Sequence, residues 1–175
     1  MNWFRITVLL LFFSQTNTIY SQLNNIIPTP KEQTIKNGFM LIENNPKIIT
    51  NDKFKSASTL LKEAINELNL DNDEKPKNRI RFSYNKKLDN EEYILRINSN
   101  LITISASTEN GAIFGFQSLN QLMNLNLNDG VIKLKSQEIK DSPRFKYRGM
   151  HLDVGRHMYP VDFIKKYIDG LAMLK

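Results

Sequence analysis

The 175-residue sequence contains no cysteine, which excludes disulfide bonds, cysteine-based zinc sites and lipid anchoring through a thiol. It has only seven glycines and six prolines, too few for a collagen-like or low-complexity chain. Its most apolar run, within residues 6–13, is too short to span a bilayer comfortably. Apolar residues still make up 41% of the chain, so these absences leave a globular protein with its own core.

The N-terminus has the layout of a secretory signal. Arg5 precedes the apolar run, polar residues follow it, and Ser21 is a small residue at a plausible cleavage point. We predict a signal peptide over residues 1–21, export, and no integral membrane segment after cleavage; the alternative is a buried N-terminal strand or helix. An exported chain without disulfides suits a bacterial periplasm or cell surface.

The formal net charge is +6, from 24 basic and 18 acidic residues. The lysines are scattered and follow no nucleic-acid-binding motif, so we interpret them as a solvated surface and expect no nucleic-acid partner. The two histidines, His151 and His157, have no companion carboxylate motif. We therefore expect no metal site and no cofactor.

The order of strand and helix patterns over residues 22–142 predicts an α+β domain with a small, mainly antiparallel sheet and helices on one face. Asn37-Gly38 is a turn pattern between two short extended pieces, and residues 98–100 predict a tight turn within a hairpin. Gly111 and Gly115 lie on one side of a helix, where close packing against the sheet is favoured over a ligand role. The predicted strands are 39–42, 47–50, 79–84, both arms of 93–105, and 131–139; the predicted helices are 56–69, which has serines available as caps, and 109–125.

The pattern changes after the break at Asp141-Ser142-Pro143. Residues 147–154 predict a dense apolar strand, and Pro160 precedes a helical pattern that runs to Lys175. A single βα unit cannot bury both faces of a parallel strand. We therefore expect the chain to be a fragment, cut inside the first unit of a larger α/β domain.

Charged residues stand at both ends of this predicted strand. Arg148 lies at its start, and Asp153, Arg156 and His157 lie at its end, where the strands of an α/β barrel face the active site. Position alone favours structural roles for all four. For Asp153 and Arg156 that role is a buried ion pair, of Asp153 with Arg156 or with another partner, that supports the first loop. For His157 it is a hydrogen-bonded packing role.

The stretch KYRGMHLDVGRHMYPVDFIKKYIDGLAMLK resembles the entry to the catalytic barrel of family 20 glycoside hydrolases, the β-N-acetylhexosaminidases. The family's first barrel strand reads R-G-x-x-x-D-x-x-R-H, followed by a proline, and Arg148 to His157 and Pro160 match it. Upstream, IIPTPKEQTIKNGFMLI and TENGAIFGFQSLNQL resemble the family's accessory domain. The resemblance implies an accessory α+β domain over residues 22–142 and the truncated start of a (β/α)₈ TIM barrel over 143–175.

The resemblance also implies an activity. Family members remove terminal N-acetylglucosamine or N-acetylgalactosamine from glycans by substrate-assisted retaining hydrolysis. The family's catalytic Asp-Glu pair lies on a later barrel strand, so no catalytic residue is expected in this chain and the chain alone should be inactive. Arg148 matches the arginine that binds hydroxyls of the terminal sugar, and a glycan is the expected partner. The alternative is a non-catalytic carbohydrate- or protein-interaction module.

Overall fold

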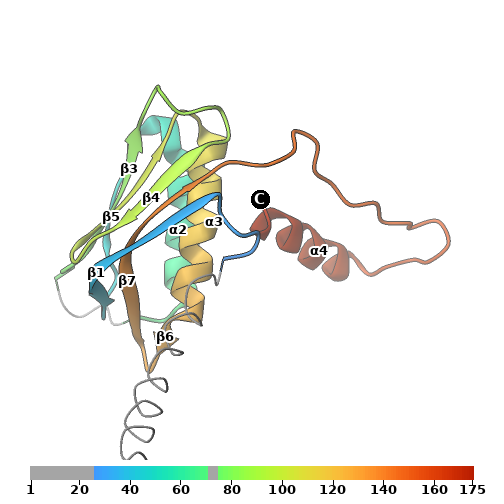
Figure 1. Ribbon diagram of the computed structural model, residues 1–175. Helices are drawn as coiled ribbons and strands as arrows, with labels where there is room; N and C mark the ends of the chain where they lie inside the picture. Colours follow the sequence, from blue (N-terminus) through green and yellow to red (C-terminus); the bar gives the residue numbers. More distant parts are fainter. Residues whose placement is uncertain (1–25, 71–74) are drawn as a thin grey trace, which may run out of the picture.

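The computed structural model of the protein describes residues 26–70 and 75–175, so the predicted signal peptide lies outside the described residues. Figure 1 shows a sheet covered by two helices, followed by a long extended segment and a separate helix. The elements are β1 (Glu32–Ile42), β2 (Lys47–Ile49), the short helix η1 (Asp52–Phe54), α2 (Lys55–Glu67), β3 (Arg79–Tyr84), β4 (Tyr93–Ile97), β5 (Leu101–Ala106), α3 (Glu109–Leu125), β6 (Leu127–Asn128), β7 (Val131–Asp141) and α4 (Val161–Met173).

The strands of the described residues form one seven-stranded sheet in the order β1-β7-β4-β5-β3-β2, with β6 paired to β7. The pairs β1–β7, β7–β4, β4–β5 and β6–β7 are antiparallel. The pairs β2–β3 and β3–β5 are parallel. The prediction of a mainly antiparallel sheet is confirmed; β2 and β3 can pair in parallel because the connection between them contains the crossover helix α2.

The helices α2 and α3 cover one face of this sheet (Figure 1), as predicted. Ile80, Leu95, Ile102 and Ile104 project from the strands into the core beneath them. At Gly115 of α3 an added Cβ would lie 2.6 Å from Cγ2 of Ile104, and at Gly111 it would lie 2.6 Å from a backbone oxygen. Close packing of these two glycines against the sheet is therefore confirmed.

Two local predictions were wrong. Asn37-Gly38 does not separate two strands; it lies inside β1, where the register with β7 shifts between Ile35 and Phe39 and Gly38 has a φ of +99°. The turn pattern thus forms a β-bulge, because β7 supplies a continuous partner on both sides of it. Helix α2 begins after Phe54 without a side-chain cap from its serines, and Glu109 Oε1 of α3 instead accepts the Ala57 amide at 2.7 Å.

The predicted strand over residues 147–154 is absent. These residues have no regular structure, and most of them are exposed. A strand is stable only where neighbouring strands take its backbone hydrogen bonds, and no described strand lies beside this segment. The helix predicted after Pro160 does form, as α4, but it contains no buried residue. The described part of the chain has no helix long and apolar enough to cross a membrane.

Candidate functional site

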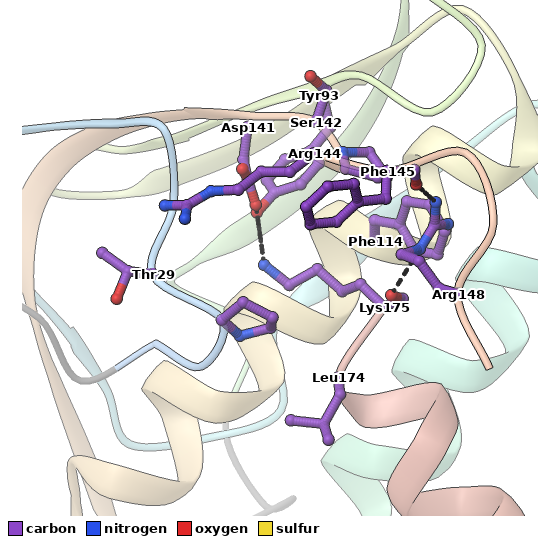
Figure 2. A pocket seen from close by; sticks show the side chains of 12 residues that line it. Thr29, Tyr93, Phe114, Asp141, Ser142, Arg144, Phe145, Arg148, Leu174 and Lys175 are labelled. Atoms are coloured by element: carbon purple, nitrogen blue, oxygen red, sulfur yellow. Dashed lines mark hydrogen bonds and ion pairs between the residues drawn. The ribbon is translucent and has the colours of Figure 1, made fainter. Parts of the chain in front are cut away.

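A cavity of about 290 Å³ lies where the sheet domain meets the C-terminal segment. Figure 2 shows that its walls come from the segment before β1, β4, α3, the end of β7, the segment after β7 and the last residues of the chain. The lining residues are Pro28, Thr29, Tyr93, Phe114, Asp141, Ser142, Pro143, Arg144, Phe145, Arg148, Leu174 and Lys175.

A buried polar network occupies one end of this cavity. Tyr93 Oη donates to Asp141 Oδ2 at 3.0 Å and lies 2.5 Å from the Ser118 hydroxyl. Lys175 Nζ donates to Asp141 Oδ2 at 3.0 Å and to Tyr93 Oη at 3.1 Å, as Figure 2 shows for the lysine and the aspartate. The lysine and aspartate side chains are only 6% and 12% exposed, so this is a desolvated ion pair.

Burial sets the protonation of this network. It raises the pKa of Tyr93 far above its ordinary value, and the neighbouring Asp141 carboxylate raises it further, so the phenol stays protonated. Burial also lowers the pKa of Lys175, and the attraction of Asp141 offsets part of that effect. The Tyr93 phenol is therefore not poised to release a proton near neutral pH, and its hydrogen bonds give the network a structural role.

Arg148 lies at the other end of the cavity, and its guanidinium donates hydrogen bonds to oxygen atoms of the protein. Its Nη2 donates to Glu91 Oε1 at 3.0 Å, its Nη1 donates to the Phe145 carbonyl at 2.6 Å, and its Nε donates to the Lys175 carbonyl at 3.1 Å. The guanidinium carbon lies 5.5 Å from the centre of the Phe114 ring. Arg148 therefore joins the turn before β4 to the two ends of the C-terminal segment.

The remaining predicted residues lie apart from the cavity. Asp153 and Arg156 form the expected ion pair, at 3.4 Å, but it is exposed rather than buried, because no described element covers it. Asp153 Oδ1 accepts the amides of Gly155 and Arg156 at 2.9 and 3.1 Å, so it does support the loop. His157 is exposed and does not pack, for the same reason.

The cavity can bind a small group but does not contain a hydrolytic pair. Asp141 is the one side-chain carboxylate among its described lining residues. This carboxylate already accepts hydrogen bonds from Lys175 and Tyr93. Acid–base cleavage of a glycosidic bond requires a proton donor and a second stabilising group. Among the described residues, no cluster of three potential metal ligands is present either.

Sequence reasoning missed Tyr93, Glu91 and Lys175 as partners in this region. The first two lie in a part of the chain that was interpreted only as strand and turn. A polar hydroxyl at the start of the buried strand β4 was the available indication for Tyr93, because a buried phenol requires a partner. Nothing in the local pattern pointed to Glu91 or Lys175.

Comparison with known proteins identifies the family. The family model described as "Glycosyl hydrolase family 20, domain 2" matches residues 23–142, and "Glycosyl hydrolase family 20, catalytic domain" matches residues 145–175. The first match covers well over half of the chain. The chain therefore belongs to glycosyl hydrolase family 20.

Individual relatives agree with this assignment. A beta-hexosaminidase of Porphyromonas gingivalis is 31% identical over 170 residues, which cover 89% of this chain and 22% of the relative. A beta-hexosaminidase of Vibrio furnissii is 37% identical over 91 residues, covering 52% of this chain and 15% of the relative. The chain thus spans less than a quarter of the length of these relatives.

Solved structures show the same fold. The chain resembles the family 20 exo-β-N-acetylglucosaminidase of Vibrio harveyi in complex with N-acetylglucosamine, with a TM-score of 0.75 and 27% identity over 89% of this chain and 25% of that one. It resembles the β-N-acetylhexosaminidase of Bacteroides fragilis with a TM-score of 0.72 and 29% identity, over 86% and 31% of the two chains. The accessory domain followed by the start of a barrel is therefore confirmed as the fold class.

Proposed function

We propose that the protein carrying this chain is an exported β-N-acetylhexosaminidase that removes terminal N-acetylglucosamine or N-acetylgalactosamine from glycans. The observation that carries the proposal is the order of the two family matches, an accessory domain followed directly by the beginning of a catalytic domain. The names of the relatives and the N-acetylglucosamine complex of the Vibrio harveyi enzyme support the substrate class.

The proposed reaction is substrate-assisted retaining hydrolysis. The 2-acetamido oxygen of the substrate attacks the anomeric carbon, a glutamate protonates the leaving oxygen, and a neighbouring aspartate orients the acetamido group. From residue 141 onward the aspartates are Asp141, Asp153, Asp162 and Asp169, and none of them precedes a glutamate. We therefore expect the 175 residues alone to be inactive.

Arg148 is proposed to bind hydroxyls of the terminal sugar. Its planar guanidinium has five donors in a fixed fork, which suits two adjacent hydroxyl oxygens. In this structure the fork already holds a carboxylate and two carbonyl oxygens. In a sugar complex, hydroxyl oxygens of the sugar would replace these protein oxygens as acceptors. The guanidinium donors of Arg148 would therefore remain hydrogen-bonded.

The exposed apolar side chains of residues 145–160 favour the enzyme over a free-standing interaction module. Tyr147 and Met158 are 91% and 93% exposed, and Phe145 and Met150 are also largely uncovered. A stable monomer rarely leaves such residues in one continuous segment. Barrel strands and helices packed around this segment would cover them.

The activity is tested with the full-length protein and a chromogenic N-acetyl-β-glucosaminide. We expect release of the chromophore from this substrate and none from the matching glucoside, which lacks the acetamido nucleophile. Equal turnover of both substrates would contradict the mechanism, and no turnover of N-acetylhexosaminides would overturn the proposed function. The 175-residue chain serves as the inactive control.

The role of Arg148 is tested in the full-length protein with Arg148→Ala and Glu91→Gln. Loss of charged hydrogen bonds to the sugar should lower kcat/KM by about 10- to 100-fold in the arginine variant. Glu91→Gln should have little effect, because it removes only the contact within the protein. Equal losses in the two variants would show that Arg148 acts through Glu91 and not on the sugar.

Export is tested by following the protein in its native cell. A signal peptide over residues 1–21 predicts that the mature protein appears in the extracytoplasmic fraction about 21 residues shorter. An intact N-terminus recovered from the cytoplasmic fraction would contradict the proposal.

A further inference from the structure

The face of the sheet opposite α2 and α3 is open, and its charges are distributed unevenly. Gln121 of α3 donates to the Met173 carbonyl, so the C-terminal segment also attaches on the helix-covered side. Figure 1 likewise shows α4 beyond the two helices and away from the open face. The open face is therefore available to a ligand without displacing any described element.

On the half of this face formed by β1, β4 and β7 the acids are paired with bases, although Lys133 and Lys135 of β7 form no ion pair among the described residues. Arg96 Nε donates to Glu138 Oε2 at 2.7 Å, and Lys36 lies 3.4 Å from the same oxygen. Lys140 lies 3.4 Å from Glu32. Each acid stands beside a base on a neighbouring strand, as cross-strand pairing favours.

The other half, on β2 and β3, carries bases without acids. Lys47 stands directly opposite Arg79 in the parallel ladder, and Arg81 follows on the same face. All three side chains are exposed, whereas Ile80 and Phe82 between and beside them are buried on the helix side. Within the described residues none of the three forms an ion pair; we call Lys47, Arg79 and Arg81 the basic edge patch.

This arrangement opposes folding stability. Like charges directly opposite one another on a sheet repel, and the repulsion is relieved when an anion lies between them. Alternate residues of a strand are about 7 Å apart and neighbouring strands about 5 Å apart, so the patch presents three cationic heads over a small, flat area. The neighbouring half of the same sheet shows that acids could have been placed beside these bases.

The chemistry around the patch limits its ligand. The open face of β5 beside it presents Leu101, Thr103 and Ser105, and β2 presents Ile49, so these described strands offer no aromatic ring for stacking on this face. Single-stranded nucleic acids are bound largely through such stacking. Protein interfaces are commonly anchored by tryptophan or tyrosine, and the described residues of β2, β3 and β5 present neither on this face.

We propose that the basic edge patch binds an anionic polysaccharide through the carboxylate or sulfate groups of the chain. The choice of a glycan among polyanions rests on the proposed function, because such a chain would then be held by the protein that trims its end. The patch would act as a secondary holding site on the accessory domain, remote from the sugar hydroxyls assigned to Arg148.

The proposal is tested with the full-length protein and fluorescently labelled hyaluronan, which carries carboxylates, and chondroitin sulfate, which carries both groups. We expect binding to at least one of them, weakening as salt rises, and no binding to neutral dextran. Arg79→Gln/Arg81→Gln should weaken binding about tenfold. The matched control Lys133→Gln/Lys135→Gln removes the same charge from β7 and should change binding less than about threefold.

Three results would overturn the proposal: no binding of either charged glycan, equal losses in the two double variants, or tighter binding of a single-stranded oligonucleotide than of the glycans. Turnover of a small neutral N-acetylhexosaminide should be the same in all variants. Glycan binding is measured without turnover. A protein that does not hydrolyse N-acetylhexosaminides would contradict the proposed function, whereas the basic edge patch is tested by the binding measurements alone.

Discussion

Two helices of equal length show how differently the two regions of this molecule are built. Helix α2 in the sheet domain (residues 26–141) and helix α4 in the C-terminal segment (residues 142–175) both have 13 residues and an apolar stripe. Helix α2 buries Ala57, Leu61 and Ile65, whereas α4 buries nothing. The stripe predicts a helix in both places, but burial depends on whether the fold supplies a surface for it to cover.

The sheet domain therefore has a core of its own, whereas the described C-terminal segment contributes no buried residue to it. The C-terminal segment is joined to the sheet domain mainly by two sets of polar contacts. Arg148 forms an ion pair with Glu91, and Lys175 contacts Asp141 and Tyr93. Both sets of contacts are polar and lie at the two ends of the C-terminal segment. The chain between them has little apolar burial to stabilise it.

The largest expected effect is in limited trypsin digestion of the 175-residue chain. Cleavage after Arg144, Lys146 or Arg156 should be at least about a hundredfold faster than cleavage within the strands, because the segment opens without disrupting a core. Mass spectrometry should show a stable product that ends near residue 144. Equally rapid cleavage at Arg79, Arg81 or Lys133, which are exposed but lie in strands, would contradict the comparison.

Next in size is the effect of a methyl group at two helical glycines. Gly115→Ala should lower the free energy of unfolding by about 2 kcal/mol, since the added carbon meets Ile104 at 2.6 Å and the Tyr93 ring at 3.2 Å. Gly170→Ala in α4 is the matched control, because no atom of the described residues lies within 4 Å of its added carbon. Urea unfolding measures both. A stable Gly115→Ala variant would show that the α3–sheet contact adapts.

A smaller effect on stability is expected from the buried hydrogen-bond network of Tyr93, Ser118, Asp141 and Lys175. Tyr93→Phe removes the hydroxyl that meets Ser118, Asp141 and Lys175, which should cost about 1 kcal/mol of unfolding free energy and speed trypsin cleavage of the segment. Tyr147→Phe removes a hydroxyl from a 91% exposed ring and should change neither quantity. If the two variants behaved alike, the network would not be what holds the segment.

The smallest effect concerns acid stability of the paired half of the sheet. The hydrogen bond from Arg96, followed by the attraction of Arg96 and Lys36, holds the pKa of Glu138 below its ordinary 4.5. The resulting stability is present above about pH 4.5 and is lost as pH falls through the lower folded-state pKa. Arg96→Gln should flatten this loss in urea titrations between pH 6 and pH 3, by less than about 1 kcal/mol. An unchanged pH profile would remove Arg96 as its cause.

Much of the fold could be predicted because its periodicities are local. The alternation of Ile80 and Phe82 marked a strand, the stripe of α3 marked a helix, and both follow from backbone geometry that a short stretch expresses by itself. The sequence also carried the motif from Arg148 to His157, which pointed to the family that the comparisons then showed.

The remaining features depend on partners far away in the chain. Asn37-Gly38 has the residues of a turn, but pairing of β1 with β7, about 100 positions later, makes it a bulge. Residues 147–154 have the composition of a barrel strand, yet no strand of the described residues lies beside them, and their backbone is irregular and exposed.

Tertiary structure likewise decided the partners of the charged groups. The sequence by itself determined that Arg148 is a five-donor cation in a family motif. Only the folded chain placed Glu91, 57 positions earlier, against its guanidinium. Side-chain chemistry is a property of one residue, whereas desolvation and hydrogen bonding belong to whatever the fold brings within about 3 Å of it.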